Sequence, residues 1–354
     1  MRIVVLGDKC FHYTTSVAKA FERLGHNVKL IYVKQFNRED LTFREYVKYK
    51  LNKKKFVEKY YNEQKDDYWN NIFDSHVDLF ININANYYFE IVDAKHIEEL
   101  RKRGVRIITW YMDSIRRCEH ISQNIEYYDR VFVFEPADIF YLKKSYKTVK
   151  IKYLPIGVAK EIFGLKEHFE KKYDISFVGS KTKNRLEILE TIASYCIQER
   201  KAMIVYGKYY EDKGCLLRRF FSKLKFKYQY PCLFKFITNK TLNGKSISEL
   251  YNKSRISLNI HINIHKGINP RTFEILAGGN FELCDYRKNS NRLGLIDNYN
   301  IVFYKNNSDC IKKIDYYLRD TEKREEISKE GYRLIKEKYY MDTILNHFLR
   351  YCTK

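Results

Sequence analysis

The chain has 354 residues, 45% of them hydrophobic and only 14 glycine and 4 proline, a composition that excludes a disordered protein. Its length suits two domains, each large enough to bury its own core. The formal net charge of +22 favours anionic partners, and among these we expect an acidic acceptor or an anionic membrane surface rather than nucleic acid.

Neither a membrane helix nor a disulfide framework is expected. No stretch approaches the roughly 18 consecutive apolar residues of a membrane helix, and the opening "MRIVVLGDK" is too short an apolar run for a signal peptide. The eight cysteines are scattered without a C-x-x-C pair, which disfavours disulfides and zinc. We therefore expect reduced thiols in a cytoplasmic protein.

The first half alternates short apolar strands with helical stretches. "RIVVLG" predicts a strand, residues 16–24 a helix that ends at Gly25, and "NVKLIYV" a second strand. Further strands are expected at "VDLFININ", "VRIITWYMD", "RVFVFE" and "VKIKYLP", with helices at 95–103 and 137–145 and a basic, aromatic helical stretch at 43–64. Helix-length connections between short strands predict a parallel sheet that is covered on both faces.

The strand pattern lapses at residues 155–172, where we expect a charged connector. A second strand series follows at "YDISFVGS", "AMIVYG", "ISLNIHI", "NFELCD" and "YNIVFY". The helices expected there cover residues 184–200, 248–254, 308–319, 322–338 and 340–351. The pattern predicts an α/β protein with two Rossmann-like domains, 1–160 and 161–339, that face a central cleft, and ligands should bind beyond the carboxyl ends of the strands.

The segment "NPRTFEILAGGNFELCD", residues 269–285, contains a short helix with unusual chemistry. Asn269 is a good N-cap and Pro270 a good first helical residue. The helix amides and the Arg271 guanidinium would hold a diphosphate, and the Glu274 carboxylate on the same face could accept both hydroxyls of a ribose. The spacing alone fits a simple Arg–Glu ion pair at least as well as it fits such a ligand site, and the pair would stabilise the helix by a few tenths of a kcal/mol.

This segment resembles the N-x-R-x-F-E-x-x-A-x-G-G block of glycosyltransferases with the two-domain GT-B fold, and the chain looks similar to the spore-maturation-protein-like bacterial group. The blocks "YDISFVGSKTKNR", "LYNKSRISLNIH" and "DCIKKIDYYLRDTEKREEISKEGYRLIKEKY" extend the resemblance over most of residues 172–340. The first half is similar more loosely, through "ITWYMDS", "VFVFEPADIFYLKKS" and "YLPIGV". The resemblance implies a nucleotide-sugar donor on the second domain, an acceptor on the first, and a closing helix, 340–354, that crosses back to the first domain.

The resemblance also implies roles for single residues. Glu274 matches the glutamate that binds the ribose, and Arg271 lies at the phosphate end of the same helix, after the Asn269 cap. The other matching positions are Gly179 and Ser180 in the turn after the domain's first strand, Arg185 on the following helix as a second phosphate contact, and Tyr206 and Gly207 at the end of the next strand, where the base commonly packs.

One position departs from the family pattern. Many related retaining enzymes carry a second glutamate eight residues before the ribose-binding one, and here that position is Lys266. This leaves the sugar contact, and retention against inversion, open. Glu282 restores an E-x7-E spacing with Glu274, but it lies within a predicted strand and we interpret it as coincidence. No D-x-D motif is present, so we expect no metal ion and a largely electrostatic catalysis.

An inverting reaction would need a base from the first domain, and Asp113 and His12 follow predicted strands there. Asp113 could equally cap the segment after it. His261 and His265 stand four residues apart like metal ligands on a helix, but "ISLNIHINIH" alternates like a strand, which would separate them by about 13 Å. We expect one of them near the donor phosphates rather than a zinc site.

The basic, aromatic stretches at 43–61 and 216–236 fit amphipathic helices on an anionic bilayer, and equally fit solvated basic faces over core aromatics. We expect a metal-independent glycosyltransferase that moves a hexosyl or related sugar from a nucleotide-sugar to a cell-envelope glycan, lipid-linked sugar or protein, in the cytoplasm and in peripheral contact with the membrane. Two alternatives stay open: a non-catalytic basic interaction or surface-assembly protein on the same scaffold, which Lys266 favours, and a nucleotide-sugar epimerase of this fold.

Overall fold

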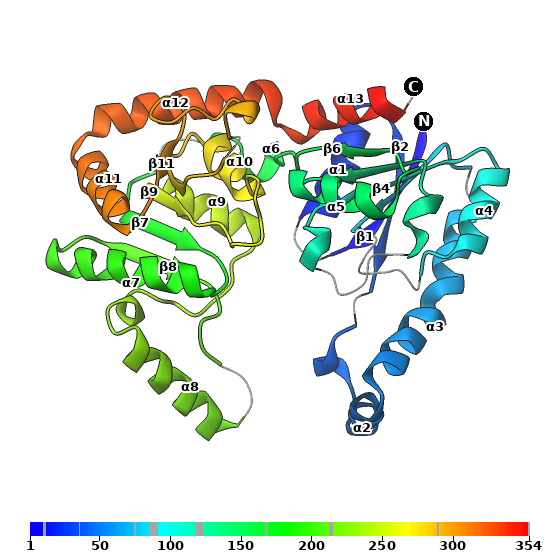
Figure 1. Ribbon diagram of the computed structural model, residues 1–354, viewed down its shortest axis with the longest axis horizontal. Helices are drawn as coiled ribbons and strands as arrows, with labels where there is room; N and C mark the ends of the chain where they lie inside the picture. Colours follow the sequence, from blue (N-terminus) through cyan, green and yellow to red (C-terminus); the bar gives the residue numbers. More distant parts are fainter. Residues whose placement is uncertain are drawn as a thin grey trace. The chain divides into compact units, whose positions relative to one another are not determined.

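The computed structural model describes residues 1–9, 12–34, 36–73, 76–84, 91–117, 123–166, 169–211, 215–288 and 290–352. The chain forms two compact units, each built on one parallel sheet (Figure 1). Unit 1 comprises Met1–Ile156 and Met341–Lys354, and unit 2 comprises Gly157–Tyr340. The predicted domains, with boundaries at 160/161 and 339/340, correspond closely to these units.

Unit 1 contains a six-stranded parallel sheet in the order β2-β1-β3-β4-β5-β6. Its strands are β1 (Arg2–Asp8), β2 (Asn27–Val33), β3 (Leu79–Ile83), β4 (Arg106–Tyr111), β5 (Arg130–Val133) and β6 (Ile151–Tyr153). Its helices are α1 (Tyr13–Arg23), α2 (Phe43–Leu51), α3 (Lys53–Phe73), α4 (Ala94–Lys102), α5 (Pro136–Ser145) and α13 (Met341–Cys352), with 3-10 turns at Arg38–Asp40, Ile115–Arg117 and Gln123–Tyr127. The inner strands are almost wholly apolar because helices cover both faces.

Helix α13 completes the core of unit 1 and packs on α1 (Figure 1). Phe348 is fully buried, and its ring lies 5.9 Å from that of Phe21, 6.2 Å from that of Trp110 and 5.0 Å from that of Phe132. One aromatic side chain from the late part of the chain thus fills the space between α1 and two strands of the sheet.

Unit 2 contains a five-stranded parallel sheet in the order β11-β10-β9-β7-β8. Its strands are β7 (Tyr173–Val178), β8 (Met203–Tyr206), β9 (Ser254–Asn259), β10 (Glu282–Asp285) and β11 (Val302–Tyr304). Its helices are α6 (Lys160–Phe163), α7 (Lys183–Gln198), α8 (Leu216–Gln229), α9 (Gly244–Asn252), α10 (Pro270–Ala277), α11 (Asn307–Arg319) and α12 (Thr321–Lys338), with 3-10 turns at Leu233–Lys235 and Ser290–Leu293.

The strand order creates a switch point in unit 2. The chain leaves β7 toward β8 on one side of the sheet, whereas β9, β10 and β11 lie on the other side. Loops that leave in opposite directions open a crevice beyond the carboxyl ends of the two strands on either side, here β7 and β9. The residues after these two strands are therefore the first candidates for a binding site.

Most predicted elements are confirmed, and four differ, one of which is the strand "ISLNIHI", because β9 ends at Asn259. The helical stretch 43–64 is two helices, because Asn52 interrupts it and accepts a hydrogen bond from the amide of Lys55 at 3.1 Å, capping α3. The helix expected at 248–254 begins at Gly244, capped by Asn243. The connector 155–172 contains the short helix α6.

Membrane-spanning helices and disulfide bonds are the next two features, and the sequence predicts neither. Among them, no helix combines the length and the apolarity that crossing a membrane requires. The six described cysteines form no disulfide bond, and Cys10 and Cys118 lie outside the described residues.

Candidate functional site

The turns after β7 and β8 come together through glycines. The Gly179 amide donates to the carbonyl of Tyr206 at 3.0 Å, and the Tyr209 hydroxyl donates to the Gly179 carbonyl at 3.1 Å. Gly207 has φ +155°, and a Cβ there would lie 2.1 Å from the Gly179 carbonyl oxygen, so no other residue fits. The structure thus brings together the predicted Gly179, Ser180, Tyr206 and Gly207, with a buried tyrosine beneath them.

Arg185 joins the two sides of the switch point. Its Nε donates to the carbonyl of Ile260, just after β9, at 2.7 Å. Its Nη1 donates to the carbonyl and the hydroxyl of Ser180, at 3.0 and 3.2 Å. The side chain is only 7% exposed, and no described carboxylate pairs with it; its second terminal nitrogen donates to none of the described residues.

Helix α7 presents an uncapped N-terminus at the same place. Its N-cap, Thr182, makes no side-chain hydrogen bond to the helix amides, because its hydroxyl donates to the Asn184 side chain at 2.7 Å. The Asn184 amide nitrogen in turn donates to the carbonyl of His261 at 3.0 Å. The positive end of a sixteen-residue helix therefore lies beside Arg185, an arrangement that favours an anion.

Helix α10 begins as the sequence predicts. The Asn269 side chain accepts from the amide of Thr272, and Pro270 takes the first helical position. A buried network fixes this end: the Asn259 amide nitrogen donates to Asn269 at 2.9 Å, to Thr272 at 3.0 Å and to Glu282 at 2.9 Å. Burial raises the pKa of Glu282 to about 7. Glu282 thus helps to fix the start of α10 by accepting hydrogen bonds from Asn259 and Thr272. This structural role agrees with the interpretation of its E-x7-E spacing as a coincidence.

His261 links the start of α10 to β10. Its ring is fully buried; Nδ1 lies 2.7 Å from an Asp285 carboxylate oxygen, and Nε2 accepts from the Asn269 amide at 3.0 Å. These partners assign the proton to Nδ1, and burial lowers the pKa of His261, so the ring is neutral. The prediction that His261 and His265 lie along one strand face is wrong, because β9 ends at Asn259 and both histidines lie in the following loop.

Cys284 and Asp285 approach His261 within metal-ligand distances, a proximity that sequence reasoning missed because β10 is distant in the chain. The Cys284 sulfur lies 3.7 Å from Nδ1 of His261. Burial and the nearby carboxylates raise the pKa of the Cys284 thiol well above its usual range, which favours the protonated thiol, a poor metal ligand. Asp285 already pairs with Arg287. The donor set fits internal hydrogen bonding better than a metal.

Arg271 and Glu274 lie on α10 near one fully buried tyrosine. Nη1 of Arg271 donates to the Tyr251 hydroxyl at 2.7 Å, and the charges of Arg271 and Glu274 both influence the pKa of Tyr251, which burial raises. Glu274 is only 5% exposed. Burial, and after it the charge of Arg271, lowers the pKa of Arg185 to about 10. Two guanidiniums close enough to destabilise each other therefore flank the switch point.

Lys266 lies exposed in the loop between β9 and α10, before the Asn269 cap. Its place in this loop puts an ammonium on the approach to the α10 N-terminus, where many related enzymes carry a carboxylate.

In unit 1, the two predicted bases follow different strands, His12 after β1 and Asp113 after β4. His12 precedes α1, with Nδ1 3.2 Å from the Ser16 hydroxyl. Asp113 follows β4, is half-buried, and accepts from the amide of Ser114 at 2.8 Å, so it does cap its own loop. Strands β1 and β4 have β3 between them.

A buried carboxylate that the sequence analysis did not single out holds the loop after β4. Asp138 is fully buried on α5 and accepts from the Ser114 hydroxyl at 2.9 Å and from Nε of Arg116 at 2.8 Å. Burial raises the pKa of Asp138 despite this cation. Glu135, also fully buried, caps α5. Asp113 therefore lies on a loop that is fixed to the start of α5.

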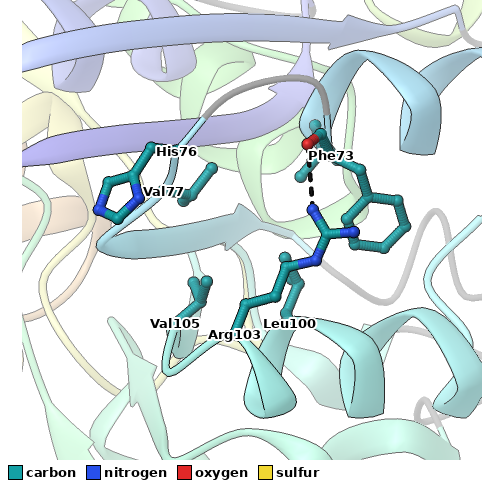
Figure 2. A pocket seen from close by; sticks show the side chains of 7 residues that line it. Phe73, His76, Val77, Leu100, Arg103 and Val105 are labelled. Atoms are coloured by element: carbon teal, nitrogen blue, oxygen red, sulfur yellow. Dashed lines mark hydrogen bonds between the residues drawn. The ribbon is translucent and has the colours of Figure 1, made fainter.

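A cavity of about 270 Å³ in unit 1 lies away from this chemistry (Figure 2). Its walls come from the ends of α3 and α4 and from the residues before β3 and β4, so it lies at the amino ends of these strands. Figure 2 shows Arg103 beside the Phe73 ring, with Nη1 donating to the Phe73 carbonyl at 3.0 Å. The cavity therefore lies at the opposite edge of the sheet from the carboxyl ends of the strands, where Asp113 lies.

Comparison with known proteins supports the interpretation of unit 2. Residues 185–350 match the family described as "Glycosyl transferase-like". No curated protein matches the chain in sequence. The matched residues start at Arg185 and include α10 with Arg271 and Glu274.

Solved structures match over the whole chain. Sucrose-phosphate synthase from Thermosynechococcus elongatus has a TM-score of 0.63 at 12% identity, covering 99% of this chain and 98% of its own. Anabaena HepE in complex with UDP and glucose has a TM-score of 0.61 at 11% identity, and the match covers 100% of this chain and 99% of HepE. The DNA-modifying enzyme beta-glucosyltransferase, solved with and without its substrate uridine diphosphoglucose, has a TM-score of 0.61 at 14% identity, and the match covers 100% of both chains. These likenesses show a shared fold, the two-domain GT-B fold.

The fold spans both units. The matched family covers Arg185, the turn after β8 and α10, but not β7 or the Gly179–Ser180 turn, which precede the match. The narrower resemblance to the spore-maturation-protein-like group stays a prediction. The chain has the two-domain GT-B fold, and its residues 185–350 form a glycosyl transferase-like domain.

Proposed function

We propose that unit 2 binds a nucleotide-sugar and that its diphosphate lies at the switch point between β7 and β9. The observation that carries this proposal is the pair of guanidiniums, Arg185 and Arg271, beside the uncapped N-terminus of α7. Arg185 is buried and Arg271 is half-buried, and the charge of Arg271 disfavours that of Arg185; a diphosphate between them would attract both guanidiniums. HepE in complex with UDP and beta-glucosyltransferase with uridine diphosphoglucose, which share the fold, support a nucleotide-sugar donor.

The remaining donor contacts follow from position. Glu274 on α10 would accept the ribose hydroxyls, because its buried carboxylate lies on the same short helix as Arg271. Tyr206 and Gly207 would border the base, since they end β8 next to the Gly179 turn, where Gly207 permits the close approach of the two backbones. Lys266 would approach the diphosphate or the sugar from the loop before α10 and add positive charge where the leaving group develops negative charge.

The chemistry we propose is electrostatic and requires no divalent metal. When the bond between the sugar and the diphosphate breaks, the guanidiniums and helix amides already face the developing charge. If the anomeric carbon is inverted, Asp113 or His12 of unit 1 would take the proton of the acceptor hydroxyl. Asp113 is favoured by its loop, which Asp138 fixes through Ser114.

For the acceptor we propose a cell-envelope glycan, a lipid-linked sugar or a protein, modified in the cytoplasm at the inner face of the membrane. The net charge of +22 supports an anionic acceptor or surface. A nucleotide-sugar epimerase of this fold would convert the donor without any acceptor, and a non-catalytic scaffold would turn over no donor. Product analysis with and without acceptor separates these alternatives.

The deciding experiment is nucleotide binding by calorimetry to the Glu274→Ala variant. We expect the affinity for the preferred nucleoside diphosphate to fall at least about a hundredfold, because two charge-assisted hydrogen bonds to the ribose hydroxyls are lost. Glu249→Ala, which removes an exposed carboxylate on α9, is the matched control and should bind normally. Unchanged affinity in Glu274→Ala would remove the assignment. Comparing UDP, GDP, ADP and CMP in a thermal-shift assay identifies the base.

A further inference from the structure

Helix α8 is almost entirely exposed. In Figure 1 it extends away from the sheet of unit 2. Of its fourteen residues only Phe226 is buried, and Ser222 is half-buried. Six large apolar side chains are exposed on it: Leu216 (76%), Leu217 (66%), Phe220 (58%), Phe221 (63%), Leu224 (44%) and Tyr228 (90%).

These six side chains form one stripe. At about 100° per residue, the series 216, 220, 224 and 228 and the pair 217 and 221 fall within an arc of roughly 140°. Phe226 and Ser222, which face unit 2, lie on the opposite side of the helix. The apolar stripe therefore points directly away from the protein, whereas an ordinary surface helix turns its apolar side inward.

Basic residues border the stripe on both sides. Arg219 and Lys223 lie along one edge and Arg218 and Lys225 along the other. Lys227 falls within the arc of the stripe, in the last turn of the helix, and the helix carries no acidic residue. Of these, Arg218 also pairs with Glu211 at 2.5 Å, outside the helix. An apolar face between two cationic borders matches the interface of an anionic bilayer, with acyl chains below and phosphate groups at the edges.

Helix α2 repeats this arrangement in unit 1. Phe43, Val47 and Leu51 lie at i, i+4 and i+8, with exposures of 83%, 42% and 81%. The Tyr49 side chain is half-buried and its ring packs on those of Phe36 and Phe56, on the opposite side of the helix. Two helices in different units thus share an outward apolar stripe among basic residues.

We propose that α8 is a membrane-docking surface that lies in the plane of an anionic bilayer with its apolar stripe among the acyl chains. Fourteen residues span about 21 Å, less than the roughly 30 Å of a bilayer core, so the helix lies on the membrane and does not cross it. A second copy of the chain is the less favoured occupant, because like-charged borders would meet in a symmetric pair. The proposal does not depend on the donor site.

The test is co-sedimentation of the purified protein with vesicles of phosphatidylcholine alone or mixed with phosphatidylglycerol. We expect binding to the mixed vesicles, weakened by salt, and a partition coefficient at least about tenfold lower for Phe220→Ser/Phe221→Ser. Phe140→Ser, which removes an 85% exposed phenylalanine on α5, is the matched control and should bind like the parent. Lys223→Glu/Lys225→Glu should lose the preference for phosphatidylglycerol.

Three outcomes would overturn the proposal: absence of binding to mixed vesicles by the parent protein, equal binding by Phe220→Ser/Phe221→Ser, or an equal loss in Phe140→Ser. A lipid-free dimer that Phe220→Ser/Phe221→Ser converts to a monomer would assign the stripe to a second copy instead. Nucleotide binding by the same variants should stay normal, so loss of docking and failure of the donor site are distinguished.

Discussion

Glu282 is the residue whose charge should most visibly affect stability. It is fully buried beneath α10, and its side chain accepts hydrogen bonds from Asn259 and Thr272. Desolvation raises its pKa from 4.5 to about 7, so the folded protein holds this proton more tightly than the unfolded chain does. The folded state therefore gains stability at low pH and loses it as pH rises from about 4.5 to about 7.

Replacing this acid with its neutral isostere should remove that dependence. Between pH 5 and 8 we expect the free energy of unfolding of the parent to fall, relative to that of Glu282→Gln, by up to about 3 kcal/mol. Urea unfolding of both proteins across this pH range measures the difference, and shared groups such as His261 cancel. A difference that does not change with pH would show that Glu282 is already ionised in the folded protein.

At the scale of elements, the start of α10 is held more strongly than an ordinary helix start. Asn269 caps the helix and also exchanges two hydrogen bonds with buried Asn259, at 2.9 and 3.0 Å. Asn243 caps α9 at an exposed position, by accepting from the amide of Ser246 at 2.9 Å. The two caps use the same side chain in different environments.

The Asn-to-Ala change at these two positions gives a matched pair. Asn243→Ala should cost about 1 kcal/mol of unfolding free energy, the usual value of a cap. Asn269→Ala should cost about 2–4 kcal/mol, because it also removes the hydrogen bond that Asn269 donates to the buried side-chain oxygen of Asn259, and it should weaken nucleotide binding. Denaturant unfolding and calorimetry measure both. Equal costs would mean that the buried network adds nothing to the cap.

Local patterns predicted the elements well but not their long-range contacts. Asn269, Pro270 and the following glycines define α10 from sequence alone, because caps and turns depend on adjacent residues. The loop after β9 was misread as strand because its apolar alternation continues past Asn259. Its histidine is held by Asp285 from another strand, a pairing that no local pattern encodes, although a carboxylate at the end of a parallel strand is itself a signal.

The same limit applies to the site. Glycines and Arg185 near the end of β7 could be found because ligands bind at the carboxyl ends of parallel strands. Tyr209 and Tyr251, which support Gly179 and Arg271, could not, because a buried tyrosine looks like any core residue until its hydroxyl has a partner. Asp138 was missed for a similar reason, since it lies inside a helix whose pattern gives it no special role.

At the scale of the whole molecule, each unit has its own core, and that of unit 1 depends on α13. Phe348→Ala should cost unit 1 about 3–5 kcal/mol, because the lost ring leaves a cavity between Phe21 and Phe132. In calorimetry the unfolding transition of unit 1 should move to lower temperature while that of unit 2 stays.

The exposed Phe140→Ala serves as the control for this change and should leave both transitions in place. If Phe348→Ala shifted both transitions equally, the two units would unfold as one body, contrary to the division into two cores.

The chain passes from unit 1 to unit 2 and later returns, and the two passages lie side by side, with the amide of Val158 donating to the carbonyl of Tyr339 at 2.8 Å. A ribosome makes α13 only after every residue of unit 2. Unit 1, although begun first, therefore cannot close its interior before the whole of unit 2 has been synthesised. It departs in this way from the usual order of co-translational folding, in which the amino-terminal part is completed first.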